Sequence, residues 1–338
     1  MEPQTGLRWG VLGSSGIARA QVIPAINATP GCRVTALASR DPARGREVAA
    51  AHGIGRVFPD YAALVASGEI DALYIPLPNA LHEDWALKAA ARGIPVLCEK
   101  PLSTGAASAR RIVEGFRSRG VPLMEAFMYR FHPLHARVRE LVAGGAIGAL
   151  RLVEAHISTD RTGQTHIAQQ KSLGGGVLLD AGCYPVNLCR MMFGSEPVSV
   201  LASQEIDPVH GTDVTTAAIL DFGDGRLGMV SASHRAGGIS SYRLVGSSGT
   251  IEVPRGFLPG WGDVLDEPLI ILTDGCTTAR REIRVDAPSQ YRLMVQAFAE
   301  ALRSGTEMPY PPEDAIATLA VTDAIFAAAA SGCRAAVG

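Results

Sequence analysis

The part of the chain from residue 7 to residue 126 alternates short apolar runs with stretches of helical periodicity. The apolar runs are Arg8 to Leu12, Arg33 to Ala38, Ala72 to Ile75, Val96 to Cys98 and Leu123 to Ala126. Between them lie 17–28, 43–52, 61–66, 83–92 and 106–119, which carry Ala, Glu, Arg and Leu at helical spacing. Strands that alternate with helices are typical of βαβ units, so this rhythm predicts a doubly wound parallel sheet.

The pattern changes beyond residue 124. A helix near 134–143 precedes a strand at 150–158 and an apolar helix at 175–193. Strand patterns then dominate, at 198–206, 215–222, 226–233, 242–245, 250–253 and 269–272, and helices at 290–304 and 313–330 close the chain. The sequence therefore predicts an α/β chain of two domains. Residues 1–124 form the first; residues 125–338 form an α+β domain with a large, mainly antiparallel open sheet and C-terminal helices packing back on the body.

Charge and composition exclude several classes of function. The chain has 31 Lys and Arg, 33 Asp and Glu, and a net charge of −2, with no basic stripe, so we expect no nucleic-acid partner. We expect no membrane partner either, because no apolar segment approaches the roughly 18 residues of a membrane span. The first seven residues lack the features of a signal peptide. These observations predict a cytoplasmic protein with a small-molecule ligand.

The chain has six cysteines, namely Cys32, Cys98, Cys183, Cys189, Cys276 and Cys333. They form no Cys-x-x-Cys pair, and no histidine pair stands at ligand spacing. We therefore expect small buried thiols in a reducing compartment, with no disulfide framework and no metal site.

The first strand runs into a glycine turn, Gly13, Ser14, Ser15, Gly16, Ile17 and Ala18. Between a strand and a helix, this turn fits the dinucleotide-binding pattern G-x-G-x-x-G/A at its first and last positions. Ser15 stands where the second glycine belongs, which implies a more distant phosphate or a contact from the hydroxyl. The turn alone would also fit an ordinary strand-to-helix connection, but its βαβ context favours a cofactor site made by these six residues.

The second strand ends in Ser39 and Arg40, and Ser39 lies 26 residues beyond Gly13. A site that prefers NAD usually has an acidic side chain at that strand end, where it binds the ribose 2′-hydroxyl. A hydroxyl and a guanidinium suit a 2′-phosphate instead, because arginine can donate two charge-assisted hydrogen bonds to it. We therefore expect NADP(H) to be preferred over NAD(H); the alternative is a surface arginine without a ligand.

Further motifs follow in order. They are Pro78-Asn79 with His82, Glu99-Lys100-Pro101, the string Glu125 to Pro133, and Leu173-Gly174-Gly175-Gly176 followed by Asp180 to Tyr184. Together with the glycine turn, they make the sequence resemble the Gfo/Idh/MocA family, named for glucose-fructose oxidoreductase and inositol 2-dehydrogenase, over nearly the whole chain. The Arg-Phe-His-Pro string and the Gly-Cys-Tyr ending are similar to its branch of sugar ketoreductases and of dihydrodiol and D-xylose dehydrogenases. The resemblance implies an N-terminal Rossmann domain that binds NADP.

Lys100 and Tyr184 are the candidate catalytic pair that this branch implies. Independently of the resemblance, reduction of a ketone delivers hydride to carbon while the oxygen gathers negative charge, so an acid and a cation are needed there. Tyr184 can donate the proton, and a neighbouring ammonium such as that of Lys100 would favour the phenolate. Either residue could be the formal donor. The alternatives are a solvated surface lysine and an amphipathic core tyrosine.

Other residues receive supporting roles. Asp180 lies one helical turn before Tyr184 and is expected to bind substrate hydroxyls, unless it only complements a helix dipole. Glu99 is expected to hold the cofactor or Lys100, and His82 to line the nicotinamide cleft or to cap and pack. The resemblance adds Pro78, Asn79 and Arg130 to the cofactor site, and it suggests a cis bond before Pro101.

One departure from the family leaves the substrate open. Related sugar reductases often have an arginine about five residues before the glycine string, whereas this chain has Ala168, within the polar stretch 160–171. Arg161, His166 and Lys171 are available to compensate. The pocket could therefore accept a free sugar, a nucleotide sugar, a polyol or a dihydrodiol.

The function predicted is an NADP-dependent oxidoreductase acting at a secondary alcohol, a ketone or the anomeric carbon of a sugar-like substrate. One alternative is D-xylose or trans-dihydrodiol oxidation. Another, of a different class, is a catalytically silent NADP(H)-binding regulator. The open sheet needs a cover on one face, so we expect a homodimer or homotetramer formed through the C-terminal sheet.

Overall fold

The computed structural model describes residues 6–164, 166–258, 268–275 and 279–338. The chain divides into two compact units, the first made of Met1–Phe131 and Pro288–Ile316, and the second of His132–Ala287 and Ala317–Gly338. The compact units thus divide the chain after residue 131 rather than after residue 124, and the first unit also includes a C-terminal segment. The functional division into a cofactor domain and a substrate domain stays a prediction.

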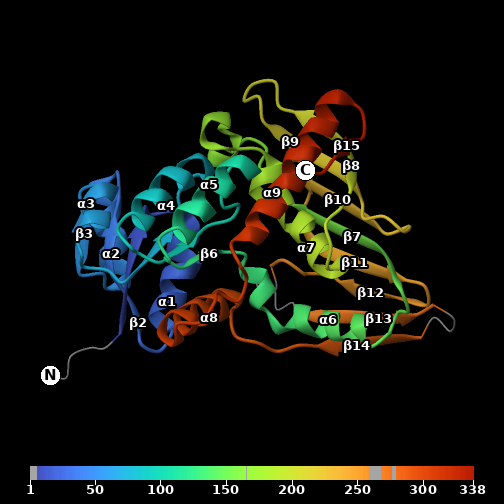
Figure 1. Cartoon of the computed structure of the whole chain (residues 1–338), viewed down its shortest axis with the longest axis horizontal. Helices are drawn as coiled ribbons and strands as arrows, with labels where there is room; N and C mark the ends of the chain where they lie inside the picture. The colour runs from blue at the N-terminus through green and yellow to red at the C-terminus, as the bar shows by residue number, and fades with distance from the viewer. Residues whose placement is uncertain (1–5, 165, 259–267, 276–278) are drawn as a thin grey trace. The chain divides into compact units, whose positions relative to one another are not determined.

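The first unit contains a six-stranded parallel sheet (Figure 1). Its strands are β1 (Leu7–Leu12), β2 (Cys32–Ala38), β3 (Arg56–Phe58), β4 (Ala72–Ile75), β5 (Val96–Cys98) and β6 (Leu123–Glu125). Their order is β3-β2-β1-β4-β5-β6, so the direction of winding reverses between β1 and β4. The predicted Rossmann sheet is confirmed, and such a reversal is where ligands bind in open α/β sheets. Sequence reasoning missed β3, a strand of only three residues.

Helices flank this sheet. They are η1 (Ala18–Val22), α1 (Ile23–Ala28), α2 (Pro42–His52), α3 (Tyr61–Ala66), η2 (Asn79–Leu81), α4 (His82–Ala90), α5 (Ala106–Arg117), η3 (Met128–Phe131) and α8 (Gln290–Ser304). Asp41 accepts hydrogen bonds from the backbone N–H groups of Ala43 and Arg44, which explains where α2 begins. α8 packs beside α1, and its Phe298 ring lies 5.2 Å from that of Trp9.

The second unit is built on a nine-stranded mixed sheet. Its strands are β7 (Leu150–Ser158), β8 (Ser199–Ile206), β9 (Asp213–Asp221), β10 (Leu227–Ser233), β11 (Ile239–Gly246), β12 (Gly249–Val253), β13 (Leu269–Asp274), β14 (Arg280–Arg284) and β15 (Ala335–Ala336). Their order is β14-β13-β12-β11-β7-β10-β9-β8-β15, in which β7 and β10 run parallel and the other neighbours are antiparallel. The predicted large, mainly antiparallel sheet is confirmed; β14 and β15 were not foreseen.

Helices and short helical turns complete this unit. They are α6 (Pro133–Ala143), η4 (Ile167–Gln169), η5 (Lys171–Leu173), η6 (Leu178–Gly182), α7 (Cys183–Phe193) and most of α9 (Glu313–Ser331). α7 packs on β7 and β10, and α6 on β13, and Figure 1 shows both helices on one side of the sheet. The side chains of β9 alternate in burial, as expected for a sheet covered by helices on one face. Val214, Thr216, Ala218 and Leu220 are buried, and Ala217 and Ile219 between them are exposed.

Two helices begin with a wide π turn, and in each a proline follows. η1 precedes α1, which contains Pro24, and η6 precedes α7, which contains Pro185. Proline has no N–H to donate to the carbonyl four residues earlier, so the regular ladder is interrupted just before it and the turn can widen. The helix predicted from residue 175 begins at Val177, because Gly175 and Gly176 hold the preceding loop.

Two expectations from composition need correction. Among the described residues, α9 is long and apolar enough by composition to cross a membrane, with a mean hydropathy of 1.4. Within its own unit, however, its Thr318 accepts hydrogen bonds from Asn187 and Arg190, and Leu319 and Ile325 are fully buried, as in a core helix. The other correction concerns the cysteines: Cys32, Cys98, Cys183 and Cys189 are buried, Cys333 is exposed, and Cys276 lies outside the described residues.

Candidate active site

The glycine turn lies at the carboxyl end of β1, on the side where the strand order reverses. Gly13 has a φ of +93° and donates its N–H to the carbonyl of Ala38 at the end of β2 (2.7 Å). A Cβ on Gly13 would lie 3.2 Å from the Leu77 side chain, so both the backbone conformation and the space favour glycine. At Gly16 a Cβ would meet nothing within 4 Å, which leaves room beside the start of the helix.

Ser15 acts as a helix cap. Its Oγ accepts a hydrogen bond from the N–H of Ala18 (3.2 Å), and its carbonyl accepts one from the N–H of Arg19 (3.2 Å). Arg19 in turn donates from Nε to the carbonyl of Ser14 (3.2 Å). The hydroxyl hydrogen of Ser15 is not used in the cap, so it can be donated to a phosphate oxygen.

The end of β2 presents one buried and one exposed side chain. Ser39 is 3% exposed, and its Oγ accepts a hydrogen bond from the N–H of Asp41 (3.3 Å). Arg40 is exposed, and no hydrogen bond or ion pair is found for it within the described residues. An unpaired guanidinium beside a strand end and the start of a helix is suited to bind a phosphate.

His82 is fully buried at the start of α4. Its Nδ1 lies 3.0 Å from the carbonyl oxygen of Pro101, and its Nε2 lies 2.8 Å from that of Leu77. Burial lowers the pKa of His82, and the contacts with these two carbonyl oxygens oppose that shift. His82 thus connects the loops after β4 and β5; Pro78 and Asn79 stand half-buried in the first of them.

Lys100 follows β5 and is half-buried, and its bond to Pro101 is cis, as the resemblance suggested. The neighbouring Glu99 accepts a hydrogen bond from the Tyr74 hydroxyl (2.7 Å) and one from the backbone N–H of Lys100 (3.3 Å). Burial raises the pKa of Glu99, while the charge of Lys100 and the Tyr74 bond oppose that shift. Sequence reasoning overlooked Tyr74, and it gave no role to the motif residue Glu125, whose Oε1 accepts from the N–H of Leu102 (2.7 Å).

Arg130 is engaged in contacts of its own unit. Its Nη1 pairs with Asp314 Oδ2 at 2.5 Å, its guanidinium lies 3.7 Å from the centroid of the Tyr310 ring, and its carbonyl accepts from the Tyr310 hydroxyl. These contacts tie η3 to the first turn of α9, through Asp314, and to the segment before it, through Tyr310. They account for Arg130 structurally, and its predicted role at the cofactor stays a prediction.

In the second unit, Asp180 is the centre of a polar cluster. Asp180 Oδ2 lies 2.9 Å from His234 Nε2 and 3.5 Å from Arg161 Nη2. His234 is 5% exposed, whereas the side chain of Asp180 is 28% exposed. His166 lies near enough that the charges of Arg161 and His234 lower its pKa and that of Asp180 raises it, with burial as the main, lowering cause. Arg161 and His166, two of the three expected compensating residues, therefore belong to this cluster.

The glycine string before η6 serves packing. Gly176 donates its N–H to the carbonyl of Ala168 (2.7 Å), and a Cβ on Gly175 would lie 2.5 Å from that same oxygen. A Cβ on Gly176, whose φ is +118°, would lie 2.1 Å from Asp213 Oδ1. Asp213, which sequence reasoning missed, is buried and accepts from the N–H of Leu178 and the hydroxyl of Thr216, both at 2.8 Å. Buried Asp213 thus fixes the start of the helix that contains Asp180.

Tyr184 lies one helical turn beyond Asp180, in the first turn of α7. It is 6% exposed, and its ring centroid lies 5.7 Å from that of Phe257. Phe257 also contacts Tyr242, whose hydroxyl lies 3.1 Å from Nδ1 of His135. An aromatic support of this kind restricts the direction of the phenol ring.

Within each unit the structure brings several predicted residues together. In the first unit, the glycine turn, the end of β2 and the residues after β4 and β5 all follow carboxyl ends of parallel strands. In the second unit, Asp180 and Tyr184 share one helix. The residue that sequence reasoning missed most clearly is His234, for which the only signal was a polar side chain directly after a predicted strand.

Comparison with known proteins gives matches to both parts of the chain. The family model described as "Oxidoreductase family, NAD-binding Rossmann fold" matches residues 7–127, and the model "GFO/IDH/MocA C-terminal domain" matches residues 135–252.

Similar proteins cover almost the whole chain. D-xylose 1-dehydrogenase (NADP(+)) 2 of Haloferax volcanii is 36% identical, over 96% of this chain and 98% of the relative. The dTDP-3,4-didehydro-2,6-dideoxy-alpha-D-glucose 3-reductase of Streptomyces violaceoruber is 35% identical, over 89% and 87%. A crystal structure of a 3-ketoreductase from Actinomadura kijaniata, in complex with NADP and TDP-benzene, is 30% identical with a TM-score of 0.90, over 96% and 98%.

Proposed function

Since this chain belongs to the Gfo/Idh/MocA oxidoreductase family, we propose that it transfers hydride between NADP(H) and a secondary alcohol, a ketone or the anomeric carbon of a sugar-like substrate. The observation that carries the proposal is the set of residues at the carboxyl edge of the first unit's sheet. There the glycine turn, the unpaired Arg40 and the Glu99-Lys100 pair follow β1, β2 and β5.

The residues of the first unit fit a dinucleotide. The turn at Gly13 can receive a pyrophosphate at the N-terminal end of a helix, and the Ser15 hydroxyl has a hydrogen to donate to it. Ser39 and Arg40 would bind the 2′-phosphate, which is the reason for preferring NADP(H) over NAD(H). The nicotinamide supplies the hydride or accepts it. His82, through the loops it connects, would hold Pro78, Asn79 and Lys100 in place.

Lys100 and Tyr184 would move the proton. In the oxidation of an alcohol, this pair would take up the hydroxyl proton while the bound nicotinamide would accept the hydride from carbon, so that the products would be a carbonyl compound, the reduced cofactor and a proton. In the reduction the same proton returns to the oxygen. The Lys100 ammonium would stabilise negative charge on that oxygen and the phenolate form of the tyrosine. Asp180 would accept hydrogen bonds from substrate hydroxyls.

The substrate is the open part of the proposal, and the relatives favour two classes. One is named for D-xylose oxidation with NADP⁺, and others for reduction of a dTDP-linked keto sugar. Ala168 leaves a small buried side chain at a position where related sugar reductases often have an arginine. We therefore propose that the substrate is a free aldose, a diol or a nucleotide sugar, and that the three classes are to be tested on equal terms.

The experiment is a screen with purified protein. NADP⁺ reduction is followed at 340 nm with aldoses, polyols and trans-dihydrodiols, and NADPH oxidation with keto sugars and dTDP-linked keto sugars. Turnover with one class identifies the substrate. Binding of NADPH in calorimetry without turnover on any compound would favour the silent regulator instead.

We also propose self-association through the open face of the second unit's sheet. Leu201, Ile219 and Met229 are exposed on it, and they are paired across β8, β9 and β10, so they form a continuous apolar row. A second copy of this chain is the occupant we propose, as a dimer or a tetramer. Light scattering after size exclusion should give a mass two or four times the 35.5 kDa of one chain, and Ile219→Lys should lower the mass to that of a monomer. Cytoplasmic location and the lack of nucleic-acid and membrane partners stay predictions.

A further inference from the structure

His234 stands directly after β10, with its main chain fixed on both sides. Its N–H donates to the carbonyl of Val214 on β9 (2.8 Å), and its carbonyl accepts from the N–H of Arg161 (2.8 Å). The ring is 5% exposed. Because the backbone is held on both sides and the ring is buried, His234 has little freedom to change the position of its ring.

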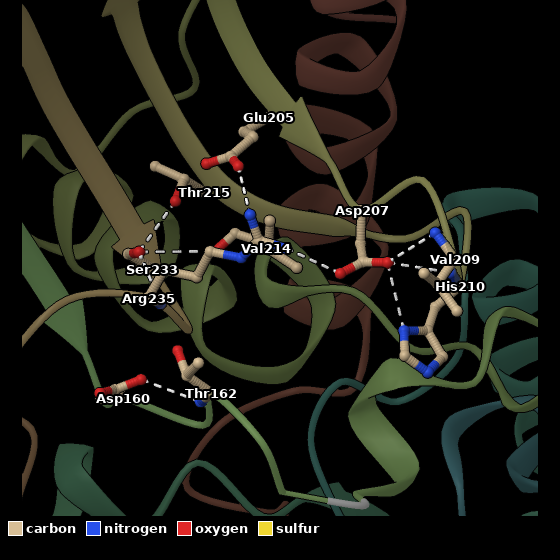
Figure 2. A network of polar contacts seen from close by, with 10 residues as sticks. All are labelled: Asp160, Thr162, Glu205, Asp207, Val209, His210, Val214, Thr215, Ser233 and Arg235. Atoms are coloured by element: carbon tan, nitrogen blue, oxygen red, sulfur yellow. Dashed lines mark hydrogen bonds and ion pairs between the residues drawn. The ribbon is translucent and has the colours of Figure 1, made fainter.

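The residue after His234 anchors the same loop to the hairpin of β8 and β9. Arg235 pairs with Glu205 Oε1 (2.5 Å) and with Asp207 Oδ2 (2.8 Å), as Figure 2 shows. Asp207 also accepts hydrogen bonds from the backbone N–H groups of Val209 and His210, and these lower its pKa. Figure 2 further shows Ser233 bonded to Thr215, so the residues on both sides of His234 are tied to neighbouring segments.

The side chain of His234 is directed at the carboxylate of Asp180. Because a carboxylate oxygen can only accept, the 2.9 Å contact requires a hydrogen on Nε2 of His234. Arg161 approaches the same oxygen, Oδ2, at 3.5 Å. One hydrogen bond from His234 and one ion pair with Arg161 on the same oxygen restrict the rotation of the carboxyl group, and with it the direction in which Oδ1 points.

We propose that His234 is a positioning residue for substrate recognition: it orients the Asp180 carboxylate so that this group can accept hydrogen bonds from a sugar hydroxyl. The inference rests on the proposed function, in which Asp180 binds the substrate. It assigns His234 no contact with the substrate and no proton transfer. His234 and Asp180 lie 54 residues apart in sequence. The helix that carries Asp180 is held at its start by Asp213, which accepts a hydrogen bond from the N–H of Leu178.

The test compares His234→Leu with His234→Gln in the native full-length protein. Leucine removes the donor, so KM for the sugar substrate should rise about 10-fold to 100-fold, the usual scale for a hydrogen bond to a charged group, with a smaller change in kcat and none in KM for NADP. Glutamine can place an amide donor where Nε2 stands, and it should restore KM to within about threefold of the native value. If the leucine variant fails to fold, His234→Asn, whose amide is too short to reach Asp180, replaces it.

A double-mutant cycle separates this role from a general loss of structure. If His234 acts through Asp180, the variant with both Asp180→Asn and His234→Leu should be no more impaired than the worse single variant. His210→Leu is the matched control, because His210 makes a similar contact, 3.2 Å from Asp207, while Asp207 keeps its backbone bonds and Arg235. That variant should keep kcat and KM within about twofold of the native values, the size of effect expected for an exposed pair.

The outcomes are distinct. If the native protein turns over a sugar and the His234→Leu variant has the same KM, the inference is overturned and the proposed function stands. The same holds if the effects of Asp180→Asn and His234→Leu add in full. A leucine variant that glutamine does not rescue would also overturn it, because a donor on Nε2 would then not be what matters. No turnover of any sugar-like compound by the native protein would overturn the proposed function, and this inference with it.

Discussion

The glycine turn of the first unit and the Asp180 cluster of the second share one local feature, a π turn, but differ in how their residues come together. Each stands at a π turn that precedes a proline, at Pro24 and at Pro185. The glycine turn is contained in six consecutive residues and the backbone bonds around them. The cluster joins residues 161, 180 and 234, which meet only when the large sheet forms. A contiguous site can be inferred from sequence, whereas a site assembled over long range needs coordinates.

The largest expected effect tests whether residues of the two units serve one reaction. Lys100→Ala and Tyr184→Phe should each lower kcat by about 100-fold or more, the scale of a lost proton-transfer group. The double variant should be little worse than the worse single variant, because the two groups act as one. Steady-state kinetics on the substrate found in the screen measures this.

Lys88→Ala is the control for these variants, since Lys88 is an exposed lysine paired with Asp84 on α4. Its turnover should be that of the native protein. Full activity in both the Lys100 and the Tyr184 variants would refute the mechanism.

A smaller effect should be confined to the cofactor. Arg40→Ala should shift the ratio of kcat/KM for NADP to that for NAD by about 10-fold to 100-fold toward NAD, through the loss of charge-assisted hydrogen bonds to the 2′-phosphate. KM for the sugar should not change. Arg44→Ala removes a neighbouring guanidinium that pairs with Glu47 on the helix surface, and it should leave the ratio unchanged. An unchanged ratio in the Arg40 variant would show that specificity lies elsewhere.

The third prediction concerns the stability of the second unit in acid. Burial lowers the pKa of His135 from 6.5 to about 3. Below pH 6.5 the unfolded chain therefore binds a proton at this residue that the folded chain does not, and the free energy of unfolding should fall as pH drops toward 3. The slope from His135 is at most about 1.4 kcal/mol per pH unit.

Urea unfolding of the native protein and of His135→Gln at pH 7, 6 and 5 measures this contribution. The variant should show a shallower decline of the free energy of unfolding with falling pH. His82 in the first unit and His132 in the second have lowered pKa values for the same reason, so part of the decline should remain. Equal slopes in both proteins would contradict the assignment to His135.

The smallest effect tests the glycine turn itself. Ser15→Ala removes the acceptor for the N–H of Ala18 and should cost about 1 kcal/mol of stability, whereas Ser15→Gly should cost only a few tenths. Both variants lose the hydroxyl that we propose donates to a phosphate, so both should bind NADPH a few-fold more weakly. Thermal melts and fluorescence titration separate the two effects. Native affinity in both variants would leave Ser15 with the capping role alone.

Much of this fold could be predicted from the sequence because its signals are local. The alternation of apolar runs and helices through residue 126 predicts the parallel sheet, and the turn signals beyond residue 198 predict the antiparallel strands. What failed was short or lacked a local signal: β3 has three residues and β15 has two. Ser15 was placed at a phosphate by its position in the motif, but its cap bond to Ala18 was not anticipated.

The candidate site was likewise predictable only where its residues stand in local motifs. Lys100, Asp180 and Tyr184 stand in motifs, so they could be proposed without coordinates. His234 and Asp213 could not, because each contacts a helix that lies more than 30 residues away in sequence. Arg130 shows the reverse case, in which a motif residue proves to be occupied by Asp314 and Tyr310.

The return of residues 288–316 to the first unit has a consequence for protein engineering. A fragment ending at Phe131 would lack α8 and leave Trp9 without its Phe298 neighbour, so it should be a poor recombinant module. The middle stretch, 132–287, is incomplete as well, because the second unit also contains residues 317–338. Chimeras that exchange the second unit between relatives should therefore be spliced at three junctions, near residues 131, 288 and 317, and keep α8 from the same parent as the first unit.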